Sequence, residues 1–166
     1  MPVLRHFYLS LGKMSLMQQA AYKNTNTLIA LLGGKASVKK PSLSGFDLIA
    51  LSNEGITRKA IESLAQHIGV SQKTFAEGIL NISVKTIERK SPMDKLDKKI
   101  SSHVIEVAKV IQHAGEVFED KDKVIRWFGK PNRALNESKP VEMLDTLTGL
   151  QMVNDILGRI EEGVYS

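Results

Sequence analysis

The chain has 166 residues, of which 42% are hydrophobic and 25% are charged, so it can bury a core as one ordinary domain or two small ones. It contains no cysteine, which excludes a disulfide framework, a thiolate metal site and a cysteine nucleophile, and which fits a cytoplasmic protein. No apolar run approaches 18 residues, so neither a transmembrane helix nor a membrane partner is expected. Arg5, His6, Gly12 and Lys13 interrupt the apolar N-terminal stretch, which argues against a secretory signal.

The net charge of +5 is concentrated near the N-terminus. Residues 1–50 carry six Lys or Arg and one acidic residue, whereas the two signs balance over residues 51–120 and again over residues 121–166. A basic N-terminal region fits contact with an acidic partner such as nucleic acid. A solvated basic segment explains the charge equally well, so both interpretations stay open.

Residues 1–42 are assigned to a basic N-terminal extension, in which the apolar run LIALL ends a candidate helix before Gly33 and Gly34. The sequence GGKAS that begins there has some likeness to a phosphate-binding loop. The first glycine of a GxxxxGK loop would fall at Ile29, however, and Ala36 replaces the Ser or Thr that binds magnesium. Nucleotide binding is therefore not expected in this segment.

From Ser44 onward the apolar residues recur with the helical period of 3.6. Ser44 is followed three residues later by Asp47, a pattern close to a capping box that predicts the start of a helix. A second helix is expected with Thr57 as its cap and Gly69 as its stop. The helical pattern is therefore continuous through this part of the chain.

The second half of the chain predicts further helices and no strand. A long helix is expected over residues 94–118, where the apolar positions keep the 3.6 period. Asp120 is expected to cap a short helix that Gly129 ends, and Pro140 suits the first position of another helix. Thr148 is expected to cap the last helix. Since no segment alternates apolar and polar residues, the predicted fold class is all-α.

Residues 71–90, SQKTFAEGILNISVKTIERK, predict two short helices joined by a tight turn, which is the arrangement of a helix-turn-helix. Asn81 lies in the turn and tolerates the left-handed conformation. The second helix of such a motif enters the major groove of DNA. The predicted DNA-binding residues are Ser83, Lys85, Thr86, Arg89 and Lys90. A plain helical hairpin is an equally good interpretation of this segment alone.

No constellation of residues points to an enzyme. His103 and His113 are ten residues apart, which does not match the i, i+3 or i+4 spacing of a helical metal pair, and each histidine fits a surface or half-buried position. The motifs GxSxG, HExxH and GxGxxG are absent. The sequence therefore predicts no catalytic residue, no metal site and no cofactor.

The run RWFGKPNRALNESKPVEMLDTLTGLQMVNDILGRIEEGVY resembles the toxin-binding domain of the Xre–MbcA–ParS antitoxins. The residues that match the pattern of that family are Arg126, Trp127, Pro131, Asn132, Ala134, Leu135, Pro140, Leu144, Thr146, Gly149, Val153, Leu157, Arg159, Ile160, Gly163, Val164 and Tyr165. The resemblance continues upstream to the helix-turn-helix. It implies a helix-turn-helix domain over residues 43–92 and a toxin-binding domain over residues 93–166.

The resemblance implies the antitoxin of a bacterial type II toxin–antitoxin pair. Its partner is expected to be a RES-domain toxin, similar to ADP-ribosyltransferases, that consumes NAD. The C-terminal tail is expected to occlude the active site of that toxin, while the helix-turn-helix binds operator DNA and represses the shared operon, with the protein as a homodimer. The expected toxin-binding residues are Arg159, Glu162, Gly163, Val164, Tyr165 and Ser166.

Alternatives remain open at several of these positions. Arg159 could instead form an ion pair with Asp155 one turn earlier in the same helix. The segment AEGILNIS is one residue longer than the L-A-x-x-L-G-(I/V)-S of the family, with Asn81 in the place of glycine, and Glu88 lies in the recognition helix. These departures affect DNA binding more than toxin binding. The alternative function is a stand-alone helix-turn-helix regulator whose C-terminal domain serves for dimerisation.

Overall fold

A computed structural model of the chain describes residues 16–17 and 27–164, and within these residues the protein is built from helices without a β-strand. The all-α fold class predicted from the sequence is confirmed. The described residues pair in β fashion only at an isolated antiparallel bridge between Thr57 and Lys95. None of the helices in this part of the chain is long and apolar enough to cross a membrane.

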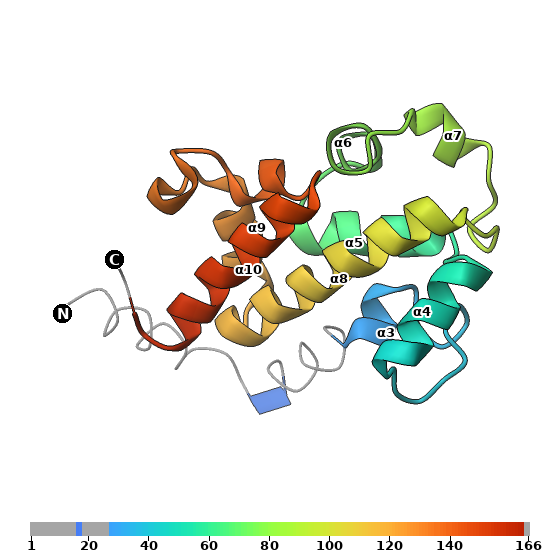
Figure 1. Cartoon of the computed structure of the whole chain (residues 1–166), viewed down its shortest axis with the longest axis horizontal. Helices are drawn as coiled ribbons and strands as arrows, with labels where there is room; N and C mark the ends of the chain where they lie inside the picture. Colours follow the sequence, from blue (N-terminus) through green and yellow to red (C-terminus); the bar gives the residue numbers. More distant parts are fainter. Residues whose placement is uncertain (1–15, 18–26, 165–166) are drawn as a thin grey trace.

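The helices follow one another along the chain and pack around one long central helix (Figure 1). The α-helices are α3 (Leu28–Leu31), α4 (Gly45–Glu54), α5 (Lys59–Ile68), α6 (Gln72–Thr74), α7 (Val84–Glu88), α8 (Lys98–Phe118), α9 (Lys121–Gly129) and α10 (Leu147–Glu161). A π-helix, η1 (Phe75–Ile79), continues α6, and two 3-10 helices, η2 (Arg133–Leu135) and η3 (Pro140–Met143), lie between α9 and α10.

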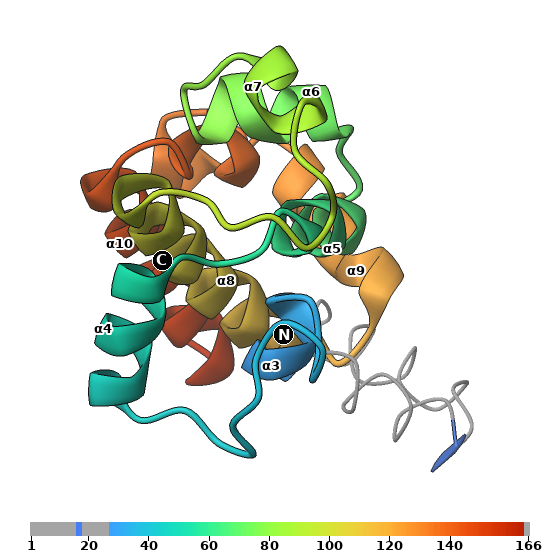
Figure 2. The ribbon, with the colours of Figure 1, turned by 90° about the vertical axis from the view of Figure 1, so that its right-hand side faces the viewer.

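Helix α8 is the common core of the molecule. It contacts α3, α4, α5, α9 and α10, and Figures 1 and 2 show it running between them. Ten of its 21 residues are buried, too many for a single narrow stripe. They include every apolar position of the predicted stripe except Ile100, which is half-buried. The two halves of the protein therefore share one hydrophobic core.

The start of α8 differs from the sequence prediction. Residues 94–96 are not helical, because they pair with the backbone before α5: Arg58 N–H donates to the Asp94 carbonyl at 2.9 Å and Leu96 N–H donates to the Ile56 carbonyl at 2.8 Å. The helix begins at Lys98 instead, with the Asp97 carboxylate accepting from the Ile100 N–H at 2.9 Å. The hydrogen bonds to the backbone before α5 have therefore replaced the first helical turn that the apolar periodicity predicted.

A buried serine holds this pairing against α8. The Ser101 hydroxyl accepts from the Ile56 N–H at 2.9 Å and donates to the Leu96 carbonyl at 3.2 Å, and its side chain has no solvent exposure. Both backbone groups are thereby satisfied inside the core, where an unpaired group would destabilise the fold. Ser101 therefore connects the segment before α5, the segment before α8 and α8 itself.

Three predicted helix starts can be compared with the structure. The capping box of Ser44 and Asp47 at α4 is confirmed, and hydrogen bonds from Lys40 and Ser44 hold the pKa of Asp47 far below its usual range. Thr57 does not cap α5, because its hydroxyl donates to Ser37 Oγ at 2.7 Å. Thr146, not Thr148, caps α10 by accepting from the third helical N–H at 3.1 Å.

Part of the segment assigned to the N-terminal extension belongs to the core. Leu31, Leu32 and Val38 are buried, and α3 contacts both α5 and α8. Gly33 and Gly34 follow α3 with positive φ angles, as expected for residues that end a helix. Of the predicted helix before Thr27, only residues 16–17 are described, and they are helical.

Replacing Ser101 by alanine should destabilise the protein by about 1–3 kcal/mol, because it leaves the buried N–H of Ile56 without an acceptor. The neighbouring Ser102 provides the matched control, since its hydroxyl pairs with Ser52 Oγ at 2.9 Å in a partly exposed position. Ser102→Ala should cost less than about 1 kcal/mol. Urea unfolding followed by circular dichroism measures both, and equal losses in the two variants would contradict the role assigned to Ser101.

Candidate functional site

The predicted helix-turn-helix segment folds as two short helical elements joined by a left-handed residue. The first element is α6 with η1, the second is α7, and Asn81 between them has φ of 54°. Ala76 and Ile87 are fully buried where the elements meet, as expected, and Ile82 is half-buried against the same core. The helices and the turn predicted from the sequence are therefore confirmed.

The π-helix explains how the segment accommodates its extra residue. In η1 the Leu80 N–H donates to the Phe75 carbonyl at 3.1 Å, an i→i+5 hydrogen bond, and the Ile82 N–H then reaches the Ala76 carbonyl at 3.0 Å. A π-turn inserts one residue into a helix while the flanking residues keep their packing. The longer spacing between Ala76 and Ile82 thus leaves Ala76 and Ile87 in the core.

The surface of α7 carries most of the residues predicted to bind DNA. Lys85 and Arg89 are one turn apart on the same side of the helix, opposite the buried Ile87. Ser83, Lys85, Thr86 and Arg89 are exposed, as is Glu88. Lys90 differs from the others, because it is half-buried and its ammonium donates to the Lys95 carbonyl at 3.2 Å. The structure thus presents four of the five predicted side chains to solvent.

The segments that contain α7 and α10 carry opposite charge. Residues 72–99, which include α7, contain seven Lys or Arg and four Asp or Glu, a net charge of +3. Residues 140–164, which include α10, contain one Arg and five Asp or Glu, a net charge of −4. Helix α7 and the last turn of α10 lie at opposite ends of the molecule (Figure 1). Residues 121–139, which include α9 next to α10, carry six Lys or Arg and two Asp or Glu, so only the α10 segment itself is acidic. The segment around α7 favours contact with a polyanion, and the α10 segment does not.

The end of α10 has a defined exit geometry. Glu162 is the C-cap residue and Gly163 has φ of 72°, a left-handed conformation that glycine adopts without strain. The Gly163 N–H donates to the Ile160 carbonyl at 3.1 Å and the Val164 N–H donates to the Arg159 carbonyl at 2.8 Å, which together form a Schellman motif. The direction of the chain beyond the helix is therefore fixed as far as Val164.

The predicted toxin-binding residues in the described part of the chain are all accessible. Arg159, Glu162 and Gly163 are exposed, and Val164 is 53% exposed. Among the described residues, Arg159 forms no ion pair with Asp155, so the alternative arrangement is not seen. Tyr165 and Ser166 lie outside the described residues.

Helix α10 is held on α8 by its apolar face and by a polar contact near its end. Leu150, Val153, Ile156 and Leu157 are buried, and Ile160 is half-buried against the core, as the sequence predicted. His113 of α8 joins two residues of α10, with Nδ1 2.7 Å from Asn154 Oδ1 and Nε2 3.3 Å from Glu161 Oε2. The histidine is half-buried, as expected, but its contacts to α10 could not be predicted from sequence.

The single tryptophan fixes the corner before α10. Trp127 is half-buried with its ring centroid 5.5 Å from that of Phe118 and 5.2 Å from that of Phe128. After this corner, Asn136 and Glu137 both adopt left-handed conformations, with φ of 53° and 64°. Asparagine tolerates the left-handed conformation better than most non-glycine residues, which suits Asn136 to this turn.

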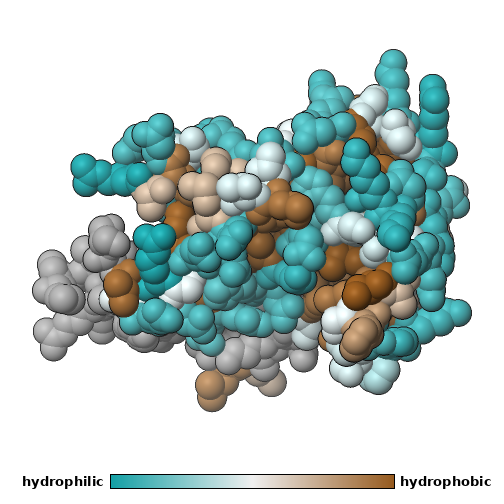
Figure 3. All heavy atoms as spheres, viewed as in Figure 1, coloured by the Kyte–Doolittle hydropathy of each residue, from teal (hydrophilic) through white to brown (hydrophobic). Residues whose placement is uncertain are grey.

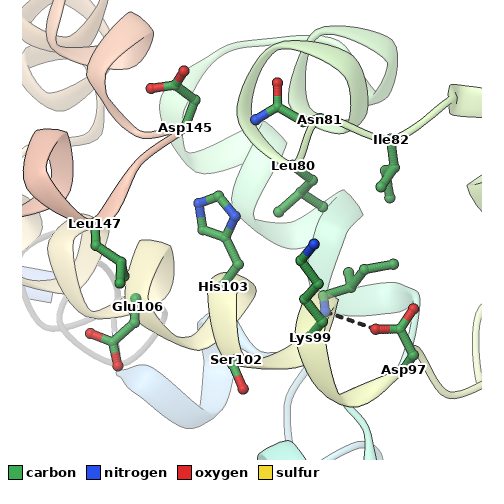
Figure 4. Close-up of a pocket in the computed structure, with 11 residues that line it drawn as sticks. Leu80, Asn81, Ile82, Asp97, Lys99, Ser102, His103, Glu106, Asp145 and Leu147 are labelled. Atoms are coloured by element: carbon green, nitrogen blue, oxygen red, sulfur yellow. Dashed lines mark hydrogen bonds between the residues drawn. The ribbon is translucent and has the colours of Figure 1, made fainter.

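A groove of about 540 Å³ lies between the helix-turn-helix and the C-terminal helices (Figure 4). Leu80, Ile82, Ile100 and Leu147 provide its apolar lining, and Asp97, Lys99, His103, Glu106 and Asp145 provide its charged and polar lining. The Nε2 atom of His103 lies 2.8 Å from the Leu144 carbonyl, which joins α8 to the segment before α10. The groove combines residues from three distant segments, so no local sequence signal indicates it.

These features define a helix-turn-helix protein with a second, C-terminal helical unit whose last described residues, Gly163 and Val164, are exposed. The family model for the antitoxin Xre-like helix-turn-helix domain matches residues 47–109, and the model for the antitoxin Xre/MbcA/ParS C-terminal toxin-binding domain matches residues 113–163. In the described residues, no group of three or more His, Asp or Glu side chains could hold a metal ion.

Three relatives support the same assignment. An "Antitoxin Xre" of Photorhabdus laumondii is 33% identical over 132 residues, which cover 76% of this chain and 86% of the relative. An "Antitoxin Xre" of Yersinia enterocolitica is 25% identical over 127 residues, covering 76% and 86%. A "Prs ADP-ribosylating antitoxin" of Sphingobium sp. is 24% identical over 133 residues, covering 74% and 83%.

The chain belongs to the Xre/MbcA/ParS-type antitoxin family. It is therefore an antitoxin of a toxin–antitoxin system, with a helix-turn-helix domain that implies DNA binding and a C-terminal domain that implies a toxin partner. Membership of this family indicates a regulatory role.

Replacing Gly149 by alanine should destabilise the C-terminal unit by about 3 kcal/mol, because the added Cβ would lie 1.9 Å from the Met143 carbonyl oxygen. Gly158 in the same helix is the matched control, since a Cβ there meets nothing within 4 Å. Gly158→Ala should stabilise the protein by about 0.5–1 kcal/mol through its higher helix propensity. Thermal unfolding distinguishes the two, and shifts of the same sign in both variants would contradict this account of the junction between η3 and α10.

Proposed function

We propose that the protein neutralises a RES-domain, NAD-consuming toxin by placing its C-terminal tail in the active-site cleft of that toxin. The observation that carries this proposal is the capped end of α10, where the Schellman motif fixes Gly163 and presents Val164 to solvent. A short tail that is ordered at its base loses little conformational entropy when it binds. The tail is thus suited to insertion into a preformed cleft.

Further features support this type of partner. The name of the Sphingobium relative refers to ADP-ribosylation, which agrees with a toxin similar to ADP-ribosyltransferases. Arg159 is the single basic residue in the last 27 residues, and its exposed guanidinium is available for a carboxylate of the toxin. Met152 and Leu147 on α10 are also exposed, which extends the proposed contact surface from the tail along the helix.

We assign the toxin contact to Arg159, Glu162, Gly163, Val164, Tyr165 and Ser166. The first four lie together in the last turn and cap of α10, and the last two follow directly in sequence. In this arrangement the buried face of α10 positions the tail, and the tail blocks the cleft.

Deleting residues 163–166 should leave the fold intact and abolish neutralisation, because it removes the tail without touching the buried face of α10. The test is growth of bacteria that co-express the toxin of the adjacent gene with either the full-length or the truncated antitoxin. Thermal unfolding of the truncated protein serves as the control for folding. Normal growth with the truncated antitoxin would contradict occlusion by the tail.

DNA binding by α7 is the second proposed activity, through which the antitoxin represses its own operon. Its support is the exposure of Ser83, Lys85, Thr86 and Arg89 in a segment, residues 72–99, with a net charge of +3. The half-buried Lys90 is the weakest member of the predicted set, because its ammonium already donates to a backbone carbonyl. Since its operator lies in the bacterial cytoplasm, we place the protein there.

Replacing Lys85 or Arg89 by alanine should weaken operator binding and reduce the slope of log K against log salt by about one per lost phosphate contact. Lys109 offers a control on α8, where its ammonium pairs with Glu106 at 2.7 Å. Lys109→Ala should leave both affinity and slope unchanged. Gel shifts at several salt concentrations provide the measurement, and full operator affinity in a Lys85→Ala, Arg89→Ala double variant would exclude α7 as the recognition helix.

Homodimerisation is proposed on a separate surface. Phe46 is 86% exposed and Ile49 is also exposed, and Figure 3 shows apolar side chains gathered over α4. An apolar strip is self-complementary about a two-fold axis, as a symmetric dimer requires.

The alternative function, a stand-alone regulator whose C-terminal domain serves for dimerisation, predicts that the product of the adjacent gene does not co-purify with this protein.

A further inference from the structure

Helix α7 is too short to orient itself. It has five residues, and isolated helices of that length are not stable in water. Its side chain Ile87 is buried in the core and Val84 packs partly against it, but both anchors lie in the first four residues of the helix and leave its C-terminal end to be held by other contacts. The angle at which α7 presents Lys85 and Arg89 must therefore be fixed by additional contacts.

One side chain outside the predicted DNA-binding set supplies such a contact. The guanidinium of Arg58, at the start of α5, donates from Nη1 to the Lys90 carbonyl at 2.9 Å, just beyond the end of α7. Its Nη2 donates to Gln72 Oε1 at 3.3 Å, at the first residue of α6, and lies 2.9 Å from Glu62 Oε1 on α5. The Arg58 side chain is only 15% exposed.

We propose that Arg58 is a positioning residue for DNA recognition, which fixes the angle of α7 against α6 without touching DNA. This inference rests on the proposed DNA binding by α7. Sequence readout needs α7 seated in the major groove with base-edge contacts in register, whereas phosphate contacts tolerate a displaced helix. Arg58 therefore sets the preference of the protein for its operator over other DNA.

The chemistry of the guanidinium suits this role. Its planar fork holds several acceptors in fixed directions, whereas a lysine ammonium is a point charge on a flexible stem. A cation at the C-terminal end of a helix also interacts favourably with the carbonyls there. Glu62 balances the charge of the half-buried guanidinium from within α5. Arg58→Lys should therefore keep the charge but lose the connection between α6 and α7.

The test compares Arg58→Lys and Arg58→Ala with wild type and with Lys59→Ala, an exposed neighbour that serves as the matched control. Affinity is measured for a duplex taken from directly upstream of the gene and for a random duplex of equal length. Both Arg58 variants should lose about tenfold in affinity for the upstream duplex and less than about twofold for the random duplex. Lys59→Ala should leave the ratio of the two affinities unchanged.

Each of the other outcomes overturns the proposal. Wild-type preference in Arg58→Lys would show that charge alone suffices, and equal losses on both duplexes would show a purely electrostatic role. Loss of co-purification with the toxin in both Arg58 variants would show that Arg58 supports the whole fold. If the wild-type protein does not prefer the upstream duplex, both the proposed operator binding and this inference are wrong. If the wild-type protein prefers it and the Arg58 variants keep that preference, only this inference is wrong.

Discussion

The fold depends on the burial of α8 between two groups of helices. This helix contacts α4 and α5 on one side and α9 and α10 on the other, and it is one continuous rod of about 32 Å. Because one buried helix contacts both groups, the helix-turn-helix unit and the C-terminal unit cannot rotate freely against each other. Helix α7 and the last turn of α10 are therefore held at opposite ends of one body (Figure 1).

This arrangement has a functional consequence for an antitoxin. For the DNA and toxin surfaces proposed above, the separation along α8 would let both partners bind without colliding. The groove between the two units is lined by Asn81 of the turn and Leu147 of α10.

The local features of the structure could be predicted from sequence patterns that involve only neighbouring residues. The capping box at Ser44, the stop at Gly69 and the left-handed Asn81 were predicted because each depends on neighbouring residues only. The predicted helix starts were wrong where hydrogen bonds to distant segments of the chain replaced the local ones. Thr57 caps no helix because Ser37 accepts its hydroxyl, and the first residues before α8 are extended because they pair with the backbone at Ile56. These partners are 20 or more residues apart, beyond the reach of any local pattern.

By itself the sequence determined the all-α class, the apolar faces of the long helices, the helix-turn-helix segment and the family to which the toxin-binding domain belongs, because periodicity and motif spacing are local properties of a chain. Only the tertiary structure decided which charged residues are free to act. It exposed Lys85 and Arg89, committed Lys90 to a carbonyl, and brought Arg58 from the start of α5 to the ends of α6 and α7. The reason is geometric, because the packing of the helices around α8 sets the distances between side chains that are far apart in the sequence.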